Sequence, residues 1–220
     1  MLRGQEVKRS TLNKDLRNLK TFINWCTENR YLNGNLKLKE LKEEERPVRS
    51  LNGAEIRKLL KATERYPSMK IRVLLALATG LRRGDIDSLK ICDIDFEKNS
   101  ISTTSRKTKK SMASRPVSAE VMAELSKYVC RFDVGQDKLF KTKFNYRKWR
   151  KVCKKAGLAD LKFHDLRKTF CSLLAQNGVS TAVTQRLLEH SSSNLTNKIY
   201  TNVDPVLRQS VEQIPVCNWL

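Results

Sequence analysis

Four polar side chains in the last third of the chain have the types and the order that phosphate chemistry requires. His164 and Arg167 are three residues apart, so they share one face of a helix. His190 is the only other histidine, and Tyr200, the last tyrosine, follows ten residues later. A guanidinium can bind two phosphate oxygens, an imidazole can donate a hydrogen bond or accept a proton, and a phenolate can attack phosphorus. The pattern therefore indicates a site that reacts with a phosphodiester.

Two helices are expected to position these groups. The first carries His164 and Arg167, and its buried face is marked by four apolar residues: Leu166, Phe170, Leu173 and Leu174. Gly178 is the residue type that commonly ends a helix. A second helix over about 181–188 would then bring His190 to its C-terminal end.

These residues belong to a set of short motifs that resembles the tyrosine recombinase (phage integrase) family. The family carries His-x-x-Arg, then Leu-Gly-His, then a tyrosine some residues later. It also carries an upstream Thr-Gly-Leu-Arg, which this chain has at 79–82. The resemblance runs from about residue 50 to about 205. Two departures are visible: Glu189 stands where the family prefers glycine, and the interval from His190 to Tyr200 is one residue longer than usual.

The resemblance implies six catalytic residues: Arg82, Lys107, His164, Arg167, His190 and Tyr200. The two arginines would bind the phosphate, and Tyr200 would attack phosphorus to form a 3′-phosphotyrosyl link. His190 is favoured as the base, although either histidine could serve. Lys107 would protonate the departing 5′ oxygen, with Lys109 as the alternative because hairpin register cannot be fixed from sequence. Rejoining reverses the reaction, so no ATP, metal or other cofactor is expected.

Arg82 has an alternative interpretation that depends on its position alone. It follows an expected core helix over 68–79, which Gly80 ends, and Asp85 and Asp87 lie close by. A surface arginine paired with one of these acids is the commoner arrangement at such a position. The Thr-Gly-Leu-Arg context favours a phosphate-binding residue instead.

The sequence as a whole predicts a mainly α protein with a small three-stranded antiparallel β-sheet (α+β). Stretch 90–118 alternates and is β-prone, which predicts the three short strands. A helix over 10–30 is predicted from six apolar residues at helical spacing: Leu12, Leu16, Leu19, Phe22, Ile23 and Cys26. Asn52 and Glu55 predict a capping box, and Ser118 is predicted to cap a later helix.

Two domains are predicted, with the boundary in the charge-rich stretch 36–50. Residues 1–46 are interpreted as part of the family's helical core-binding domain with its linker, and 47–220 as the catalytic domain. The core-binding domain is normally longer, so its start is expected to be missing here. A short helix is predicted after Asp204 and Pro205, and in the family such a tail docks on a neighbouring subunit or folds back on its own.

The charge of the chain points to a polyanionic partner. Its 220 residues carry 44 Lys or Arg against 23 Asp or Glu, a formal net charge of +21. Double-stranded DNA is the expected partner, with self-assembly on DNA from dimer to tetramer implied by the resemblance. DNA contact is predicted for a strand-connecting turn and for one face of a basic helix near 141–155: Arg106, Lys109, Lys110, Arg147, Arg150, Lys151 and Lys154.

Several other classes of protein are disfavoured. The six cysteines form no C-x-x-C pair, which suits reduced thiols in a cytoplasmic protein, here expected at the prokaryotic nucleoid. The N-terminus has no apolar run typical of a signal peptide, and no apolar run is long enough to cross a membrane. No paired carboxylates or P-loop accompany the candidate residues, which argues against a two-metal nuclease.

Two rival functions remain open from the sequence. A type IB topoisomerase-like enzyme would share the chemistry but relax DNA without exchanging partners. A DNA-binding protein on the same scaffold would carry out no chemistry, although all the expected polar residues are present. The sequence does not choose among integration, excision and resolution.

Overall fold

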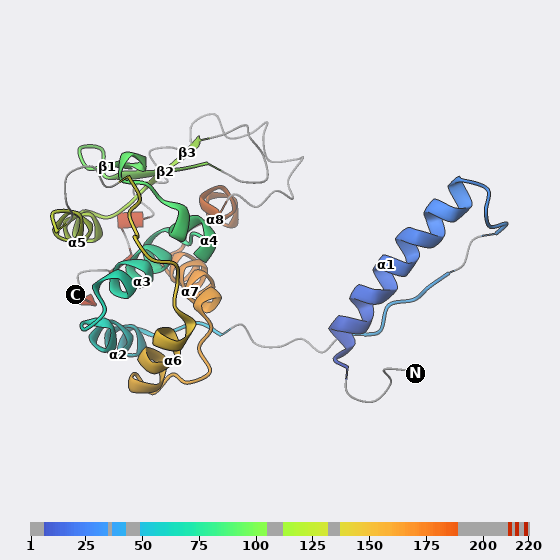
Figure 1. The fold of residues 1–220 in the computed structure, drawn as a ribbon, viewed down its shortest axis with the longest axis horizontal. Helices are drawn as coiled ribbons and strands as arrows, with labels where there is room; N and C mark the ends of the chain where they lie inside the picture. Colours follow the sequence, from blue (N-terminus) through green and yellow to red (C-terminus); the bar gives the residue numbers. More distant parts are fainter. Residues whose placement is uncertain are drawn as a thin grey trace. The chain divides into compact units, whose positions relative to one another are not determined.

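The chain is described here by a computed structural model that covers residues 7–34, 37–42, 49–104, 112–131, 137–188, 211–212, 214–215 and 218–219. It forms two compact units, Met1–Pro47 and Val48–Leu220, which we call the N-terminal and C-terminal units. Figure 1 follows both from blue to red along the chain. The architecture is mainly helical with one three-stranded sheet, which confirms the predicted fold class.

The N-terminal unit is built on one long helix, α1 (Arg9–Glu28), close to the predicted bounds. Asn13 is buried on α1 and joins it to the extended segment 37–42. Its side-chain amide donates to the Leu41 carbonyl at 2.8 Å, and its oxygen accepts from the Leu41 N–H at 2.7 Å. One side chain thus satisfies both backbone groups of an extended residue.

The apolar face of α1 is only partly covered. Ile23 and Cys26 are buried, whereas Leu19 and Phe22 are exposed although they belong to the same helical pattern. Segment 37–42 lies along a narrow stripe of the helix, and outside that stripe the Tyr31 ring stacks on Trp25 with centroids 5.7 Å apart. Helical spacing alone therefore does not establish burial.

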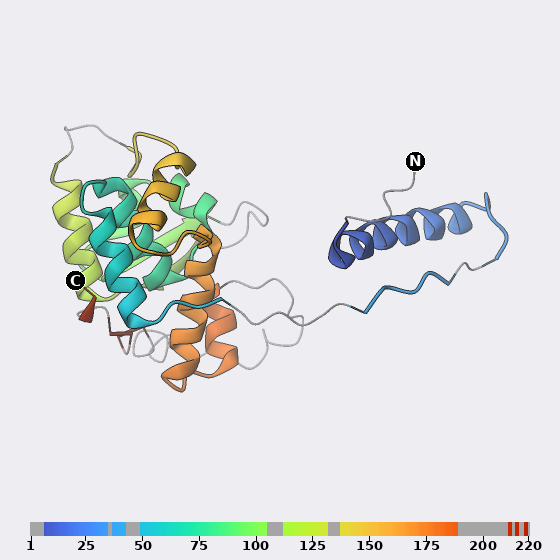
Figure 2. The same cartoon turned by 90° about the horizontal axis from the view of Figure 1, so that it is seen from below.

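The C-terminal unit contains all the other described elements, in this order: α2 (Gly53–Thr63), α3 (Pro67–Thr79), α4 (Arg83–Ser88), a 3₁₀ helix η1 (Ile91–Asp93), β1 (Ile94–Asp95), β2 (Ser100–Thr104), β3 (Met112–Pro116), α5 (Ala119–Val129), α6 (Tyr146–Lys155), α7 (Phe163–Gln176) and α8 (Thr181–Leu188). Helix α3 is the central element and packs against α2, α5 and α7. Figure 2 shows α7 and α8, both orange, side by side. The predicted bounds of α8 are confirmed.

Gly80 fixes how α3 ends against the other helices. Its φ of +62° is in the left-handed region that favours glycine. A Cβ there would lie 2.5 Å from Phe170 Cδ1 and 2.8 Å from Leu188 Cδ2. Only glycine lets the end of α3 approach α7 and α8 this closely, and Arg82 follows two residues later.

The sheet has the strand order β1-β2-β3 and is antiparallel throughout, as predicted. Ile101 on the central strand is fully buried and pairs with Ile94 on one side and Arg115 on the other. Antiparallel strands of this kind suit a short sheet that packs one face on a helical core.

The two predicted helix caps have different outcomes. The capping box is confirmed: Asn52 Oδ1 accepts from the Glu55 N–H at 2.9 Å, and the Glu55 carboxylate accepts from the Asn52 N–H at 3.0 Å. Ser118 occupies the N-cap position of α5, but its hydroxyl makes no capping hydrogen bond. Packing buries that hydroxyl instead, without a hydrogen-bond partner in the described part of the chain.

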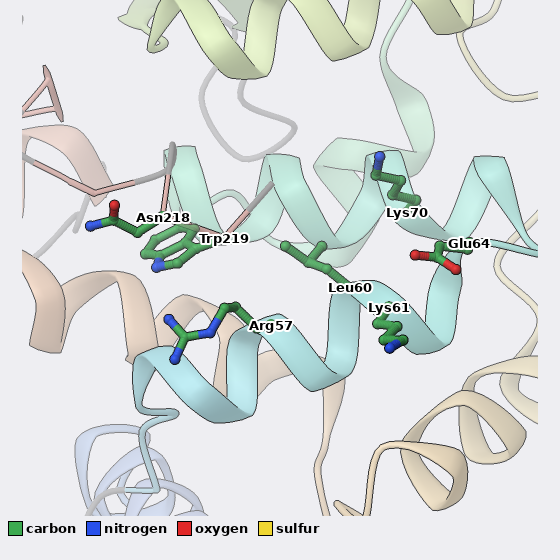
Figure 3. Close-up of a pocket in the computed structure, with 7 residues that line it drawn as sticks. All are labelled: Arg57, Leu60, Lys61, Glu64, Lys70, Asn218 and Trp219. Carbon is green, nitrogen blue, oxygen red and sulfur yellow. The ribbon is translucent and has the colours of Figure 1, made fainter.

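The described part of the C-terminal tail packs on its own unit. Val211, Ile214 and Trp219 are buried in the same core as α2 and α3. Figure 3 shows Asn218 and Trp219 beside Arg57 and Leu60, at the edge of a hollow of about 340 Å³. None of the predicted site residues lines this hollow. Among the described helices, none has the length and apolar character that crossing a bilayer demands.

Candidate nucleic-acid interface and active site

Arg167 lies at the centre of the candidate site. Helix α7 starts where the Lys162 N–H donates to the Asp165 carboxylate at 3.0 Å, and Arg167 stands one turn inside. Its side chain is only 6% exposed and donates to the Gly80 carbonyl and, at 2.8 Å, to the Leu188 carbonyl. The guanidinium therefore joins α7 to the end of α3 and the end of α8.

Arg82 lies close enough to Arg167 to affect its ionisation. Burial, followed by the positive charge of Arg82, lowers the pKa of Arg167 to about 10. Arg167 is still protonated at neutral pH. Arg82 itself is exposed at the N-cap of α4. The structure thus brings together the two arginines that the sequence predicts as the phosphate-binding pair, one buried and one facing solvent.

His164 is exposed on the same helix, one turn before Arg167, as the spacing predicts. Partial desolvation of the ring by neighbouring residues lowers its pKa, and the charges of Arg167, Lys168 and Arg82 lower it further. A lowered histidine pKa keeps the imidazole neutral at pH 7. The neutral ring can donate a hydrogen bond to a phosphate oxygen or accept a proton.

Asp87 rules out one of the predicted pairings for Arg82. It accepts from Arg72 Nε at 2.8 Å and from Arg83 Nη1 at 3.2 Å. In the described part of the chain, Arg82 pairs with neither Asp87 nor any other acid. The alternative interpretation of Arg82 as an ion-paired surface residue is therefore not what the structure contains.

The basic helix near 141–155 has one buried and one exposed side. Asn145 caps α6 by accepting from the Lys148 N–H at 3.0 Å. Trp149 is 3% exposed and donates from its indole N–H to the Leu161 carbonyl at 3.2 Å, so it is a core residue and not a base-stacking one. The predicted phosphate-contacting residues are all exposed: Arg147, Arg150, Lys151 and Lys154. A helix held on its apolar side presents these charges at fixed positions.

Six predicted site residues lie outside the described residues: Arg106, Lys107, Lys109, Lys110, His190 and Tyr200. Their roles remain predictions. Strands β2 and β3 flank segment 105–111, to which the four basic residues belong, and α8 ends two residues before His190. Across the described ranges, no three histidine, cysteine or acidic side chains gather as a metal site would require.

Arg115 is a residue of this region that the sequence analysis missed. It lies on β3, is 4% exposed, and donates from Nε to the Leu187 carbonyl at 2.9 Å and from Nη1 to the Thr103 hydroxyl. Its charge also lowers the pKa of Arg167, after burial and Arg82. Strand alternation gives the missing signal: Arg115 is two residues before the buried Val117, hence on the same face of the strand.

Comparison with known proteins agrees with the fold and with the family resemblance. The family model that describes the phage integrase family matches residues 49–206. The chain is 28% identical over 253 residues to the "Tyrosine recombinase XerC-like" protein of Caldanaerobacter subterraneus subsp. tengcongensis, covering 91% of this chain and 64% of the relative. It is 35% identical over 160 residues to "Tyrosine recombinase XerA" of Saccharolobus solfataricus, covering 71% and 53%.

Among solved structures, the integrase of the Tn1549 transposon in complex with circular intermediate DNA is similar, with a TM-score of 0.72 at 19% identity. That match covers 90% of this chain and 76% of the integrase. The chain belongs to the phage integrase family, which confirms the resemblance drawn from its motifs. It spans less than two thirds of the length of the two curated relatives.

Proposed function

We propose that this chain carries the strand-transfer part of a site-specific DNA recombinase or integrase. The observation that carries the proposal is the cluster of Arg82, Arg167 and the neutral His164, which is arranged around the buried, hydrogen-bonded guanidinium of Arg167. Guanidinium groups bind phosphate oxygens bidentately and stay protonated, so they stabilise the charge that develops when phosphorus is attacked. Membership of a family whose relatives are named tyrosine recombinases supports the reaction type.

The proposed reaction breaks and remakes a phosphodiester without an energy source. Tyr200 attacks phosphorus and forms a 3′-phosphotyrosyl link, while the 5′ oxygen leaves with a proton from Lys107. His190 is proposed as the base. Arg82, His164 and Arg167 hold the non-bridging oxygens, and the neutral imidazole of His164 does so as a hydrogen-bond donor. Rejoining runs the same steps in reverse with a 5′ hydroxyl as the attacking group.

Double-stranded DNA is the proposed partner. The exposed side of α6 supplies four cations at positions fixed by the buried Trp149 and Val152. The similar Tn1549 integrase was solved with DNA, which supports the same partner here. Self-assembly on DNA, from dimer to tetramer, is proposed with it, as is action in the cytoplasm at the nucleoid.

We propose different roles for the two units. Residues 47–220 would carry the chemistry, because they hold all six candidate catalytic residues. Residues 1–46 would form part of a core-binding domain with its linker. The exposed apolar residues of α1 support this second assignment, because an apolar helix face normally packs against other helices of a larger domain.

Trapping of a covalent adduct tests the proposed function without knowledge of the target site. The 220-residue chain would be incubated with a pool of duplexes that carry a randomised core and a nick, so that a short fragment diffuses away after cleavage. We expect a protein–DNA adduct that survives denaturation and enriches particular core sequences. Absence of adduct from Tyr200→Phe is expected, whereas Tyr146→Phe, which changes an exposed tyrosine on α6, should retain it.

A second assay separates recombination from topoisomerase activity. The enriched core would be placed once or twice in a supercoiled plasmid. A recombinase should exchange strands between two sites, whereas a topoisomerase-like enzyme should relax the plasmid equally well with one. Adduct formation by Tyr200→Phe, or relaxation without exchange, would contradict the proposed function.

A further inference from the structure

The C-terminal end of α8 is held by two buried arginines from different elements. Arg115 Nε on β3 donates to the Leu187 carbonyl at 2.9 Å, and Arg167 Nη2 on α7 donates to the Leu188 carbonyl at 2.8 Å. The last four carbonyls of a helix have no partner within the helix, and cations are favourable there. The two guanidinium groups therefore cap α8 through successive carbonyls.

Each of these arginines also reaches a second element. Arg115 Nη1 donates to the Thr103 hydroxyl on β2, the strand that ends three residues before Lys107 in the sequence. Arg167 Nη1 donates to the Gly80 carbonyl, two residues before Arg82. The end of α8 is thus joined to β2, which precedes Lys107 in the sequence, and to Gly80, which precedes Arg82. Helix α8 itself precedes His190.

Burial of both charges is unfavourable for stability alone. Arg115 is 4% exposed and Arg167 is 6% exposed, and the charge of Arg115 acts against that of Arg167. Charged groups lose solvation when they are buried, and apolar side chains of similar size often fill such places at no cost in stability. Because both guanidinium groups bind the end of α8, we interpret them as residues that position the candidate site.

We infer that Arg115 is a positioning residue that holds the strand leading to Lys107 and the helix end leading to His190 in one arrangement around Arg167. This inference rests on the proposed function. Arg115 acts through its hydrogen bonds to Thr103 and Leu187, which lie 12 and 72 residues away in the sequence. Both bonds need the forked guanidinium, because a lysine ammonium at one point cannot reproduce two fixed directions.

The inference predicts a local effect in Arg115→Lys, which keeps the charge. Adduct formation on the enriched nicked duplex should slow by about 10²-fold, the scale of a small misplacement of reacting groups. Binding to a random-sequence duplex should change by less than about twofold, because the net charge is the same. Amide hydrogen exchange over 185–188 should accelerate about tenfold or more, as expected for loss of a hydrogen bond from a charged donor.

Two further variants separate positioning from general stability. Thr103→Val keeps the shape of the side chain but removes one acceptor, so it should shift both readouts in the same direction and less. Added to Arg115→Lys, it should have no further effect, because the bond it removes is already lost. Arg72→Lys is the matched control: Arg72 is equally buried, but it is bonded to Asp87 and the Thr142 carbonyl.

The outcomes distinguish failure of the inference from failure of the proposed function. If Arg115→Lys slows adduct formation no more than Arg72→Lys at an equal folded fraction, Arg115 does not position the site. Acceleration of exchange across α2, α3 and α5 as much as at α8 would also overturn the inference. If the unsubstituted chain forms no adduct, the proposed function fails, and the exchange pattern alone then supports or overturns the link between β2 and α8.

Discussion

Helices α1 and α6 are both basic and amphipathic, but they differ in what covers their apolar side. On α6, Trp149 is 3% exposed and Val152 is 1% exposed. On α1, Phe22 is 60% exposed and Trp25 is 51% exposed, and the two rings stack with centroids 6.3 Å apart. Both helices combine basic residues with apolar residues at helical spacing, although α6 is the more basic. The comparison teaches that burial of the apolar residues depends on the partners that each unit provides.

The difference also separates the two units in function. Charges on α6 project from a helix whose orientation is fixed by the core, so they can contact phosphates at defined positions. Charges on α1 project from a helix that is anchored by Asn13 and a narrow apolar stripe. We therefore expect substitutions in the C-terminal unit to change chemistry, stability and DNA contact, and matched substitutions on α1 to have small effects.

The largest difference between the units should be in cleavage. Lys107→Ala should cleave ordinary nicked duplex about 10²–10⁴-fold more slowly if Lys107 supplies general acid catalysis. A duplex with sulfur at the bridging 5′ position should restore much of that rate, because a thiol has a pKa of about 8.5 and leaves without a proton. Lys20→Ala on α1 should cleave both substrates at the rate of the unsubstituted chain.

The lysine neighbours of Lys107 provide the internal control. Lys109→Ala and Lys110→Ala should show a modest loss that is the same on both substrates. If the sulfur substrate restores the cleavage rate of Lys109→Ala instead, the general acid is Lys109 and not Lys107. Rescue in none of the three variants would place the acid elsewhere.

The second largest difference should be in stability. Trp149→Ala removes a buried ring and leaves its space unfilled, which should lower the free energy of unfolding of the C-terminal unit by about 3–5 kcal/mol. Trp25→Ala removes an exposed ring and should change the stability by no more than about 0.5 kcal/mol. Chemical denaturation followed by circular dichroism measures both. Equal effects would contradict the comparison.

A smaller difference is expected in the salt dependence of DNA binding. Arg150→Gln with Lys154→Gln should reduce the slope of log affinity against log salt by about 1.8, if each cation contacts one phosphate. Lys14→Gln with Lys20→Gln on α1 should reduce it by less than half of that. Fluorescence anisotropy with a random-sequence duplex gives both slopes. A larger change from the α1 pair would show that α1 is the main phosphate-binding helix.

The smallest effect should be on pH dependence, and it concerns His164. Burial lowers its pKa in the folded chain, so between that value and the ordinary value near 6.5 the unfolded chain binds more protons. Stability should therefore fall as pH drops below about 6.5. His164→Gln should flatten this part of the profile, whereas an unchanged profile would show that His164 does not titrate in this way.

Local signals in the sequence predicted much of the candidate site. The spacing of His164 and Arg167 placed both on α7, and Gly80 correctly marked the end of α3. The helical spacing of Trp149, Val152 and Cys153 likewise matches the buried side of α6. In each case the determining interactions lie within a helix or its cap, so short-range patterns were sufficient.

Long-range interactions were not predictable in the same way. Arg115 is buried because Leu187, 72 residues later, accepts its hydrogen bond. Arg72 is buried because Asp87 and the Thr142 carbonyl surround it, 15 and 70 residues away. Phe22 on α1 is exposed although its spacing fits an apolar helix face, because helical spacing cannot show whether another element covers that face. The catalytic roles of Lys107 and Tyr200 remain predictions from the sequence.

The most direct test of the account is to map the residue that becomes attached to DNA. The adduct would be formed in EDTA on the enriched nicked duplex, digested with nuclease and trypsin, and sequenced by mass spectrometry. We expect the nucleotide on Tyr200, within the tryptic peptide 199–208 that follows Lys198. A nucleotide on Tyr146 in peptide 144–147, or an adduct that forms only when Mg²⁺ is restored, would contradict metal-independent strand transfer by Tyr200.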